Sequence, residues 1–217
     1  MSAIVFDIET GPRSRAELAE CVPAFEAPSN WKDPEKIRAY VAEKEAEWFQ
    51  SAALSALTGR VLAIGYLDAV TDELGYFATG DEAADLAAFW RLIAPDGYLV
   101  GDLVGFNSNR FDLPFLIRRS WHLRVPVPRD LIAGRWLPSQ CLDALETWRC
   151  GVREDSVSLD RLAQFLGVGR KTGSGADFAS QWATDPSGAL AYLANDLRLT
   201  RRCAAALGLV SETQLNA

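Results

Sequence analysis

Hydrophobic and polar positions along this chain follow two different periods, and these periods predict its elements. Four short runs have strand patterns, and they cover residues 3–7, 60–68, 73–79 and 98–106. Gly11 and Pro12 end the first run. A turn-like segment joins the second run to the third, so these two runs predict a hairpin.

Helical spacing dominates the later part of the chain. The predicted helices cover 82–93, 111–121, 158–167 and 186–207. Ser158 is a plausible N-terminal cap of the third helix, and Gly167 closes it. Between these helices, the proline- and arginine-rich segment 122–138 and the glycine-serine segment 171–175 are predicted to form loops.

The segment from about 13 to 57 differs in character from its surroundings. It is rich in charges and in good helix formers, with apolar residues such as Ile37, Tyr40 and Trp48 at helical intervals. We therefore expect a helical insertion after the first strand, packed over one edge of the core. The pattern leaves open whether this insertion is a structural brace or a lid over a substrate cleft.

The order of elements predicts an α/β fold with a mixed β-sheet flanked by helices. A length of 217 residues suits a single domain spanning 1–217, and 49% hydrophobic residues suffice for a full core. The chain has 29 acidic and 22 basic residues, a net charge of −7, which argues against holding long nucleic acid by electrostatics alone. This charge is still compatible with a protein that binds a short end of nucleic acid, or with one whose acidic residues bind metal.

The cellular location of the protein is predicted from features that its sequence lacks. It has no apolar run of about eighteen residues, so no membrane partner is expected. The N-terminus enters a strand pattern without the features of a secretory signal. The four cysteines form no C-x-x-C pair and are expected to be reduced, which favours a cytoplasmic protein.

Candidate chemistry begins with a pair of acids on the first strand. Asp7 and Glu9 are two residues apart, so their side chains lie on the same face of a strand. Like charges that close repel each other unless a cation lies between them, and carboxylate oxygens suit magnesium or manganese. The alternative is a strand end with two solvated acids.

Two further sites carry acids at the ends or on the faces of helices. Asp112 follows the polar turn of FNSNRFD near the start of a helix, where Asp is also common for capping reasons alone. Tyr192 and Asp196 are four apart in YLAND, so both lie on one side of the last helix. Neither feature is specific by itself, because many surface helices have such spacings.

The three motifs taken together are specific. FDIET (6–10), FNSNRFD (106–112) and YLAND (192–196), in this order, resemble the motifs of the DEDD superfamily of 3′–5′ exonucleases, in its tyrosine-bearing branch. They are most similar to the proofreading domains of family B DNA polymerases and their stand-alone relatives. SLDRLAQFLG ahead of a K-x-G-rich loop also fits, and the resemblance spans the chain outside the insertion.

The resemblance implies a ribonuclease H-like fold and two-metal phosphodiester hydrolysis. Two Mg²⁺ or Mn²⁺ ions would be held by Asp7, Glu9, Asp112 and Asp196. Tyr192 would position the attacking water, because an ordinary tyrosine, with a pKa near 10, is a poor base at pH 7. His122 lies outside every motif and is expected to be an ordinary residue.

Substrate contacts are expected next to these motifs. A backbone amide near Thr10 or Gly11 could meet a terminal 3′-hydroxyl, and Asn107 and Phe111 could touch sugar and base. Lys171 and some of the arginines that follow the second motif or lie near the third are candidates for a phosphate track. Core packing is an equally good account of Phe111.

The leading hypothesis is therefore a metal-dependent 3′–5′ exonuclease that acts on single-stranded ends, with DNA favoured over RNA. One alternative is a 3′–5′ exoribonuclease, since nothing in the sequence indicates recognition of a 2′-hydroxyl. Another is a catalytically silent module that binds nucleic acid or a protein partner on the same fold, although the intact acids argue against it. The chain has no room for a polymerase domain, and it does not indicate any protein partner.

Overall fold

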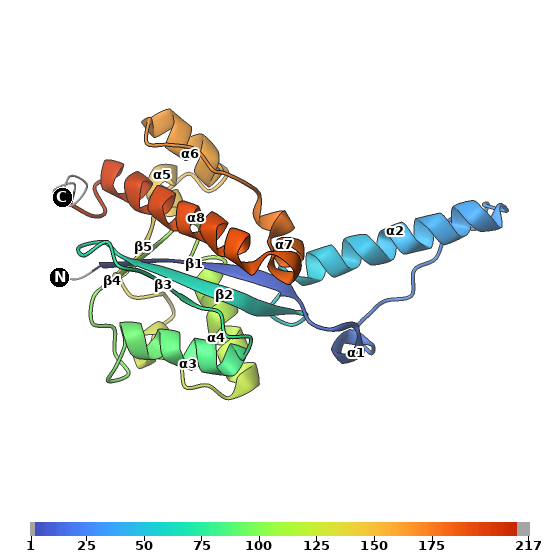
Figure 1. The fold of residues 1–217 in the computed structure, drawn as a ribbon, viewed down its shortest axis with the longest axis horizontal. Coiled ribbons are helices and arrows are strands. Elements are labelled where there is room, and N and C mark those ends of the chain that lie inside the picture. Colours follow the sequence, from blue (N-terminus) through green and yellow to red (C-terminus); the bar gives the residue numbers. More distant parts are fainter. Residues whose placement is uncertain (1–2, 212–217) are drawn as a thin grey trace.

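A mixed five-stranded sheet forms the centre of the protein, and the computed structural model describes residues 3–211 of it (Figure 1). The sheet order is β3-β2-β1-β4-β5. The strands are β1 (Ala3–Pro12), β2 (Gly59–Asp68), β3 (Leu74–Phe77), β4 (Asp102–Gly105) and β5 (Cys141–Asp143). β1 pairs antiparallel with β2 and parallel with β4, so the central strand joins a meander to a parallel pair.

Helices cover both faces of this sheet (Figure 1). One face carries α3 (Glu82–Ile93) and α4 (Asp112–Leu123), and the other carries α7 (Phe178–Thr184) and α8 (Pro186–Ala206). The remaining helical elements are α1 (Arg15–Leu18), α2 (Pro34–Ala52), α5 (Ala144–Arg149), α6 (Leu159–Leu166) and the 3-10 turns η1 (Arg129–Leu131) and η2 (Gly175–Asp177). No helix within residues 3–211 is both long enough and apolar enough to cross a membrane.

The alternation of side chains along β1 divides the core into two layers. Phe6 and Ile8 face α3 and α4, where the Phe6 ring lies 5.6 Å from the ring of Phe89. Ala3 and Val5 point to the opposite face and pack with apolar residues of α8. Asp7 and Glu9 share this second periodicity, so the fold directs their carboxylates toward α8.

A glycine in β2 allows α8 to lie close to the sheet. A Cβ atom at Gly65 would stand 2.7 Å from Leu197 Cδ1 and 2.9 Å from Leu193 Cγ, which is nearer than real atoms approach. Gly65 is also the register partner of Asp7 on β1. The close approach therefore brings the middle of α8 next to the acidic part of β1.

Most elements predicted from the sequence are confirmed. α3 has the predicted bounds, the β2–β3 hairpin is present, and α6 is capped by Ser158 and ended by Gly167. β1 is longer than predicted, because Gly11 and Pro12 continue its pairing with β2 instead of ending it. β4 is shorter than predicted, while β5, α5 and α7 were not predicted.

The insertion buries Leu18 and Ala52 near its two ends, but α2 between them does not lie over the core, so that expectation is wrong for α2. α2 projects from the body of the protein as an arm (Figure 1), and Ala52 at its end is its buried residue. One face of α2, which carries Ile37, Tyr40 and Trp48, is partly covered, but none of these three side chains is buried in the core. Tyr40 instead packs locally on Trp31, which precedes the helix, with ring centroids 5.4 Å apart.

Candidate active site

Two neighbouring acids of β1 meet a third acid, distant in sequence, between β1 and α8. Asp7 and Glu9 extend from β1, and Asp196 extends from the middle of α8. Each offers a carboxylate oxygen, and these three atoms all lie within 4.8 Å of one another. The described residues thus contain an oxygen cluster of the kind that could hold a hard divalent cation.

Asp112, the first residue of α4, reaches the same strand from the side of β4. Its Oδ1 accepts a hydrogen bond of 3.1 Å from the backbone N–H of Ile8. This N–H is available because the ladder between β1 and β4 ends at the pair Val5–Val104. Asp112 is thereby held beside Asp7, whose pKa its charge raises.

A β-bulge lies next to the acids on β1. The register with β2 shifts between Glu9 and Thr10, because Leu62 of β2 has no partner on β1. Glu9 and Thr10 both line one cavity, together with Ile8. Bulges frequently redirect side chains next to functional sites, and this one places Thr10 beside the acidic cluster.

Asp143, a buried residue at the end of β5, organises the turn that precedes Asp112. Its carboxylate accepts the N–H groups of Asn107 at 2.9 Å and Asn109 at 3.0 Å, as well as those of Leu145 and Glu146 in α5. Asn107 adopts a left-handed φ of 61°, which these bonds help to hold. Asp143 was not among the predicted site residues, although its place before the helical run ALETW is typical of an N-cap.

Lys171 contributes positive charge to the cluster. Its Nζ lies 2.5 Å from Asp196 Oδ2 and 5.1 Å from the centroid of the Tyr192 ring. Its backbone N–H donates to Asp160 of α6 at 2.9 Å, which ties the loop that carries Lys171 to that helix. The charge of Lys171 also opposes the rise in the pKa values of Asp7 and Glu9.

Burial raises the pKa values of all four acids, and repulsion from the other carboxylates adds to the rise at Asp7 and Glu9. The pKa of Asp7 is raised well above its usual value by burial and then by Asp112, Glu9 and Asp196. Burial and the charge of Asp196 raise the pKa of Glu9 to about 8, and burial raises that of Asp112 to about 7. The pKa of Asp196 is also raised by burial, against the opposing effect of Lys171. Such a cluster favours a bound cation, which offsets the repulsion.

Two buried polar atoms of α8 have no hydrogen-bond partner among the described residues: the hydroxyl of Tyr192 and Oδ1 of Asp196. Buried polar groups normally have partners, so these atoms have unused capacity for a cation, water or substrate. Burial and then the carboxylates of Asp196 and Glu9 raise the pKa of Tyr192, so its hydroxyl keeps its proton at neutral pH. The donor set and these unpartnered atoms fit a divalent cation.

A cavity of about 610 Å³ opens onto this cluster. The predicted site residues that line it are Asp7, Glu9, Thr10, Asn107, Phe111, Asp112, Lys171, Tyr192 and Asp196. Gly11 does not line it, because it is buried in the β1–β2 ladder, where a Cβ would stand 2.8 Å from Leu62 Cδ1. The substrate contact expected at Gly11 stays a prediction.

A second wall of the cavity belongs to the insertion, whose individual residues were not predicted to take part in the site. It comes from the end of α2 and the residues after it, and its members are Glu47, Gln50, Ser51, Ala53 and Leu54. No local signal could have identified it, because these residues belong to the insertion that the motifs do not cover. Residues of η2 and α7, such as Ala176 and Ala179, line the cavity as well.

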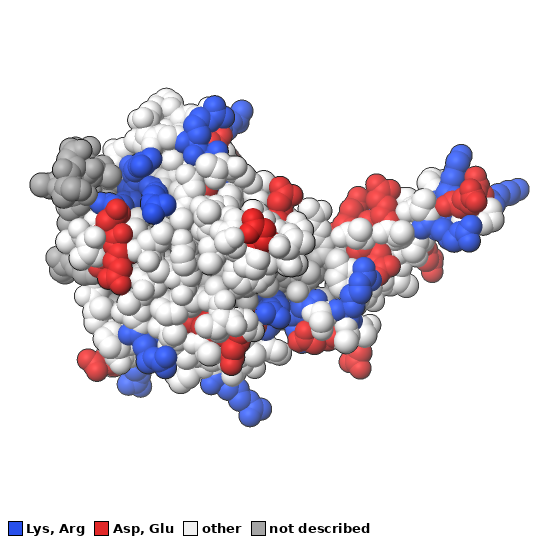
Figure 2. Space-filling view, viewed as in Figure 1, with Lys and Arg blue, Asp and Glu red and all other residues white. Residues whose placement is uncertain are grey.

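The expected phosphate track is not continuous. Several of its arginines are engaged elsewhere: Arg119 pairs with Glu82 at 2.7 Å, Arg110 with Glu146 at 3.3 Å, and Arg201 with Asp72. Figure 2 shows basic and acidic side chains next to one another over the described part of one face, without a continuous basic strip there. Among the described residues that line the cavity, Lys171 alone is basic, and His122 is exposed outside it.

Comparison with known proteins supports the fold. No family model and no curated protein matches this chain. Among solved structures, the chain is similar to the family B DNA polymerase from the hyperthermophilic archaeon Pyrobaculum calidifontis, with a TM-score of 0.59 and 19% identity. The match covers 95% of this chain and 24% of the polymerase, so the chain spans about a quarter of that protein's length. It confirms an α/β, ribonuclease H-like mixed sheet flanked by helices.

Proposed function

We propose that this protein is a metal-dependent 3′–5′ exonuclease of the tyrosine-bearing DEDD branch, which releases nucleotides from single-stranded nucleic acid ends. The observation that carries the proposal is the meeting of Asp7, Glu9 and Asp196 within 4.8 Å, at a cavity that Asp112 and Tyr192 also line. Acids from three separated motifs converge there, as phosphodiester hydrolysis with two cations requires.

The residues present fit two divalent cations, Mg²⁺ or Mn²⁺. In this proposal Asp7, Glu9 and Asp196 hold one cation, and Asp7 and Asp112 hold the other, with Asp112 acting directly or through water. When bound, such cations lower the pKa of a water ligand and offset charge on the leaving oxygen. The oxygen donors, the raised pKa values and the unpartnered Asp196 Oδ1 all support this assignment.

The other residues of the cavity bind and orient. The buried hydroxyl of Tyr192 orients the attacking water by hydrogen bonding, since its raised pKa makes it unsuited to remove a proton. Thr10 and Asn107 bind the terminal sugar, Phe111 contacts a base, and the ammonium of Lys171 attracts the scissile phosphate. With one basic side chain in the cavity, binding of the strand is weak and strongly salt-dependent.

DNA is the proposed substrate because the sequences of the three motifs resemble those of polymerase proofreading domains, and because a family B DNA polymerase has a similar fold. The test is a gel assay of 5′-labelled single-stranded DNA with Mg²⁺, Mn²⁺ or chelator, run beside RNA of the same sequence. A ladder that shortens from the 3′ end, with either metal and not with chelator, is the expected result. Internal cuts, or no cleavage with either metal, would contradict the proposal, and faster cleavage of RNA would reassign the substrate.

A further inference from the structure

The end of the α2 arm forms part of the cavity, although the arm itself stands away from the body. We call the cavity-lining residues Glu47, Gln50, Ser51, Ala53 and Leu54 the foot of the arm. Leu54 keeps 65% of its surface exposed, so an apolar side chain borders the cavity without a partner in the core. An exposed leucine at the rim of a polar cavity has surface to bury against a ligand.

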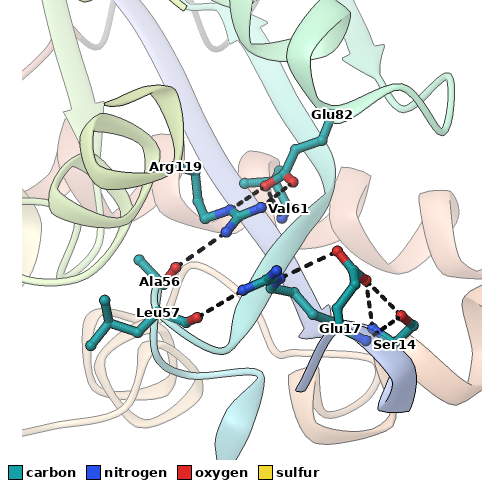
Figure 3. Close-up of polar contacts among 8 residues, drawn as sticks. Ser14, Glu17, Ala56, Leu57, Val61, Glu82 and Arg119 are labelled. Carbon is teal, nitrogen blue, oxygen red and sulfur yellow. Dashed lines mark hydrogen bonds and ion pairs between the residues drawn. The ribbon is translucent and has the colours of Figure 1, made fainter. Parts of the chain in front are cut away.

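The foot is fixed to the body and does not behave as a hinged lid. Arg119, a buried residue of α4, donates to the carbonyl of Ala56 at 3.3 Å while its guanidinium pairs with Glu82 of α3 (Figure 3). Glu82 also accepts the N–H of Val61 in β2 at 2.8 Å (Figure 3). One buried ion pair thus joins the residues after α2 to both a helix and a strand.

The start of the insertion is tied to the same place. Arg13 donates to the carbonyl of Leu57 at 3.3 Å, and Ser14 and Glu17 form a reciprocal capping box on α1 (Figure 3). Arg15 of α1 lies 4.2 Å above the ring of Phe49 in α2. A Cβ at Gly59 would stand 2.8 Å from the carbonyl oxygen of Ala53, so this glycine permits close packing under the foot. The foot is therefore a rigid wall.

The chemistry of the foot suits a nucleobase and not a phosphate. Its members are an amide, a hydroxyl, two aliphatic side chains and one acid, with no basic group. Phe106 and Phe111 line the same cavity and offer aromatic surface. A volume of about 610 Å³ is within the range of about 300–1,000 Å³ that small-molecule sites occupy, which is enough for a nucleotide.

We propose that the foot of the α2 arm is the wall against which the terminal base of the strand packs, so that the insertion contributes to substrate binding. Leu54 contacts the face or edge of this base, and Gln50 offers its amide to the polar edge. This inference rests on the proposed exonuclease function and deepens it, because it assigns the base contacts to a segment outside the three motifs.

The test compares Leu54→Ala and Gln50→Ala with a matched control on the distal arm, Lys36→Ala. Each variant is assayed on one oligonucleotide that carries either a normal or an abasic 3′-terminal nucleotide. Leu54→Ala is expected to raise KM for the normal end about three- to tenfold with little change in kcat, since the lost contact is apolar and Leu54 is not a proposed cation ligand. On the abasic end its KM should equal that of the unchanged protein.

Rescue by Leu54→Met, which keeps an apolar contact, would support the wall and exclude a purely structural effect. An unchanged KM in both foot variants, or an equal rise on normal and abasic ends, would overturn the inference. Oligonucleotide binding by fluorescence anisotropy is measured in parallel. If the unchanged protein cleaves nothing, the proposed function fails, while a base-dependent loss of binding in Leu54→Ala still supports the wall.

Discussion

The acidic cluster and the α2 arm use the same types of charged residue with opposite consequences. In the cluster, Nζ of Lys171 lies 2.5 Å from Oδ2 of Asp196. On the arm, Nζ of Lys44 lies 2.7 Å from Oε2 of Glu47. The carboxylate of the first pair is 3% exposed, whereas that of the second is 54% exposed. Burial, and not distance, therefore decides how strongly an ion pair affects stability, because water screens the charges of the pair on the arm.

The acids of the two regions show the same contrast in their pKa values. Burial and neighbouring charge raise the pKa of Glu9 to about 8. Hydrogen bonds from Ser14 lower the pKa of the exposed Glu17, beside the arm, to about 2. The cluster concentrates uncompensated charge that a cation can neutralise, while the insertion satisfies its charges with local partners.

The largest effect is expected from Asp7→Asn. Loss of a proposed cation ligand should reduce the rate of hydrolysis by more than about a hundredfold. Even the loss of a residue that only hydrogen-bonds to a metal ligand typically reduces activity or metal affinity about 10–100-fold. Initial rates on single-stranded DNA measure this, and Tyr192→Phe should lose less. Removing one of several repelling carboxylates should leave the Tm in chelator no lower than before. Cleavage by Asp7→Asn at the original rate would contradict the assignment.

The matched pair Lys171→Met and Lys44→Met tests the contrast directly. In chelator, Lys171→Met should lower the free energy of unfolding by roughly 1–3 kcal/mol, because it leaves buried carboxylates without their cation. Lys44→Met should leave the Tm unchanged, because its pair lies in solvent. Urea denaturation of both variants provides the measurement, and equal losses would refute the role given to burial.

Gly65→Ala tests whether the cluster depends on the close approach of α8. The added Cβ would overlap Leu193 and Leu197, so we expect a loss of about 1–2 kcal/mol of stability together with weaker cation binding. Gly134→Ala is the control, because the nearest atom to its added Cβ would be 3.4 Å away. Calorimetric titration with Mn²⁺ measures the second effect. Unchanged cation affinity in Gly65→Ala would show that cation binding by the cluster does not depend on the close packing of α8.

The dependence of stability on pH gives a further test of the cluster. Glu9 and Asp112 have pKa values of about 8 and 7 in the folded protein, above their ordinary values, so the folded state binds more protons than the unfolded state between about pH 5 and 8. Stability in chelator should therefore fall as pH rises through this window, by about 1 kcal/mol or more. Saturating Mg²⁺ should flatten the profile. A rise in Tm with pH in chelator would contradict the electrostatics of the cluster.

Local sequence predicts the elements that carry their own signals. α3 and α6 have capping residues and an apolar stripe, and their bounds were predicted. β5 has three residues and exists only through its parallel pairing with β4, so no local pattern marks it. The role of Asp143 depends on the same pairing, because only the fold brings its carboxylate to the turn at Asn107.

The sequence by itself determined the chemistry of this protein: which acids are present, that Asp7 and Glu9 share a strand face, and that Tyr192 and Asp196 share a helix face. These relations follow from backbone periods of two and 3.6 residues, which operate within a few positions. Only the tertiary structure decided that the two faces meet, that α2 stands away from the core and that its foot borders the cavity. Such outcomes depend on packing between distant segments, as at Gly65 and Arg119, which no local period encodes.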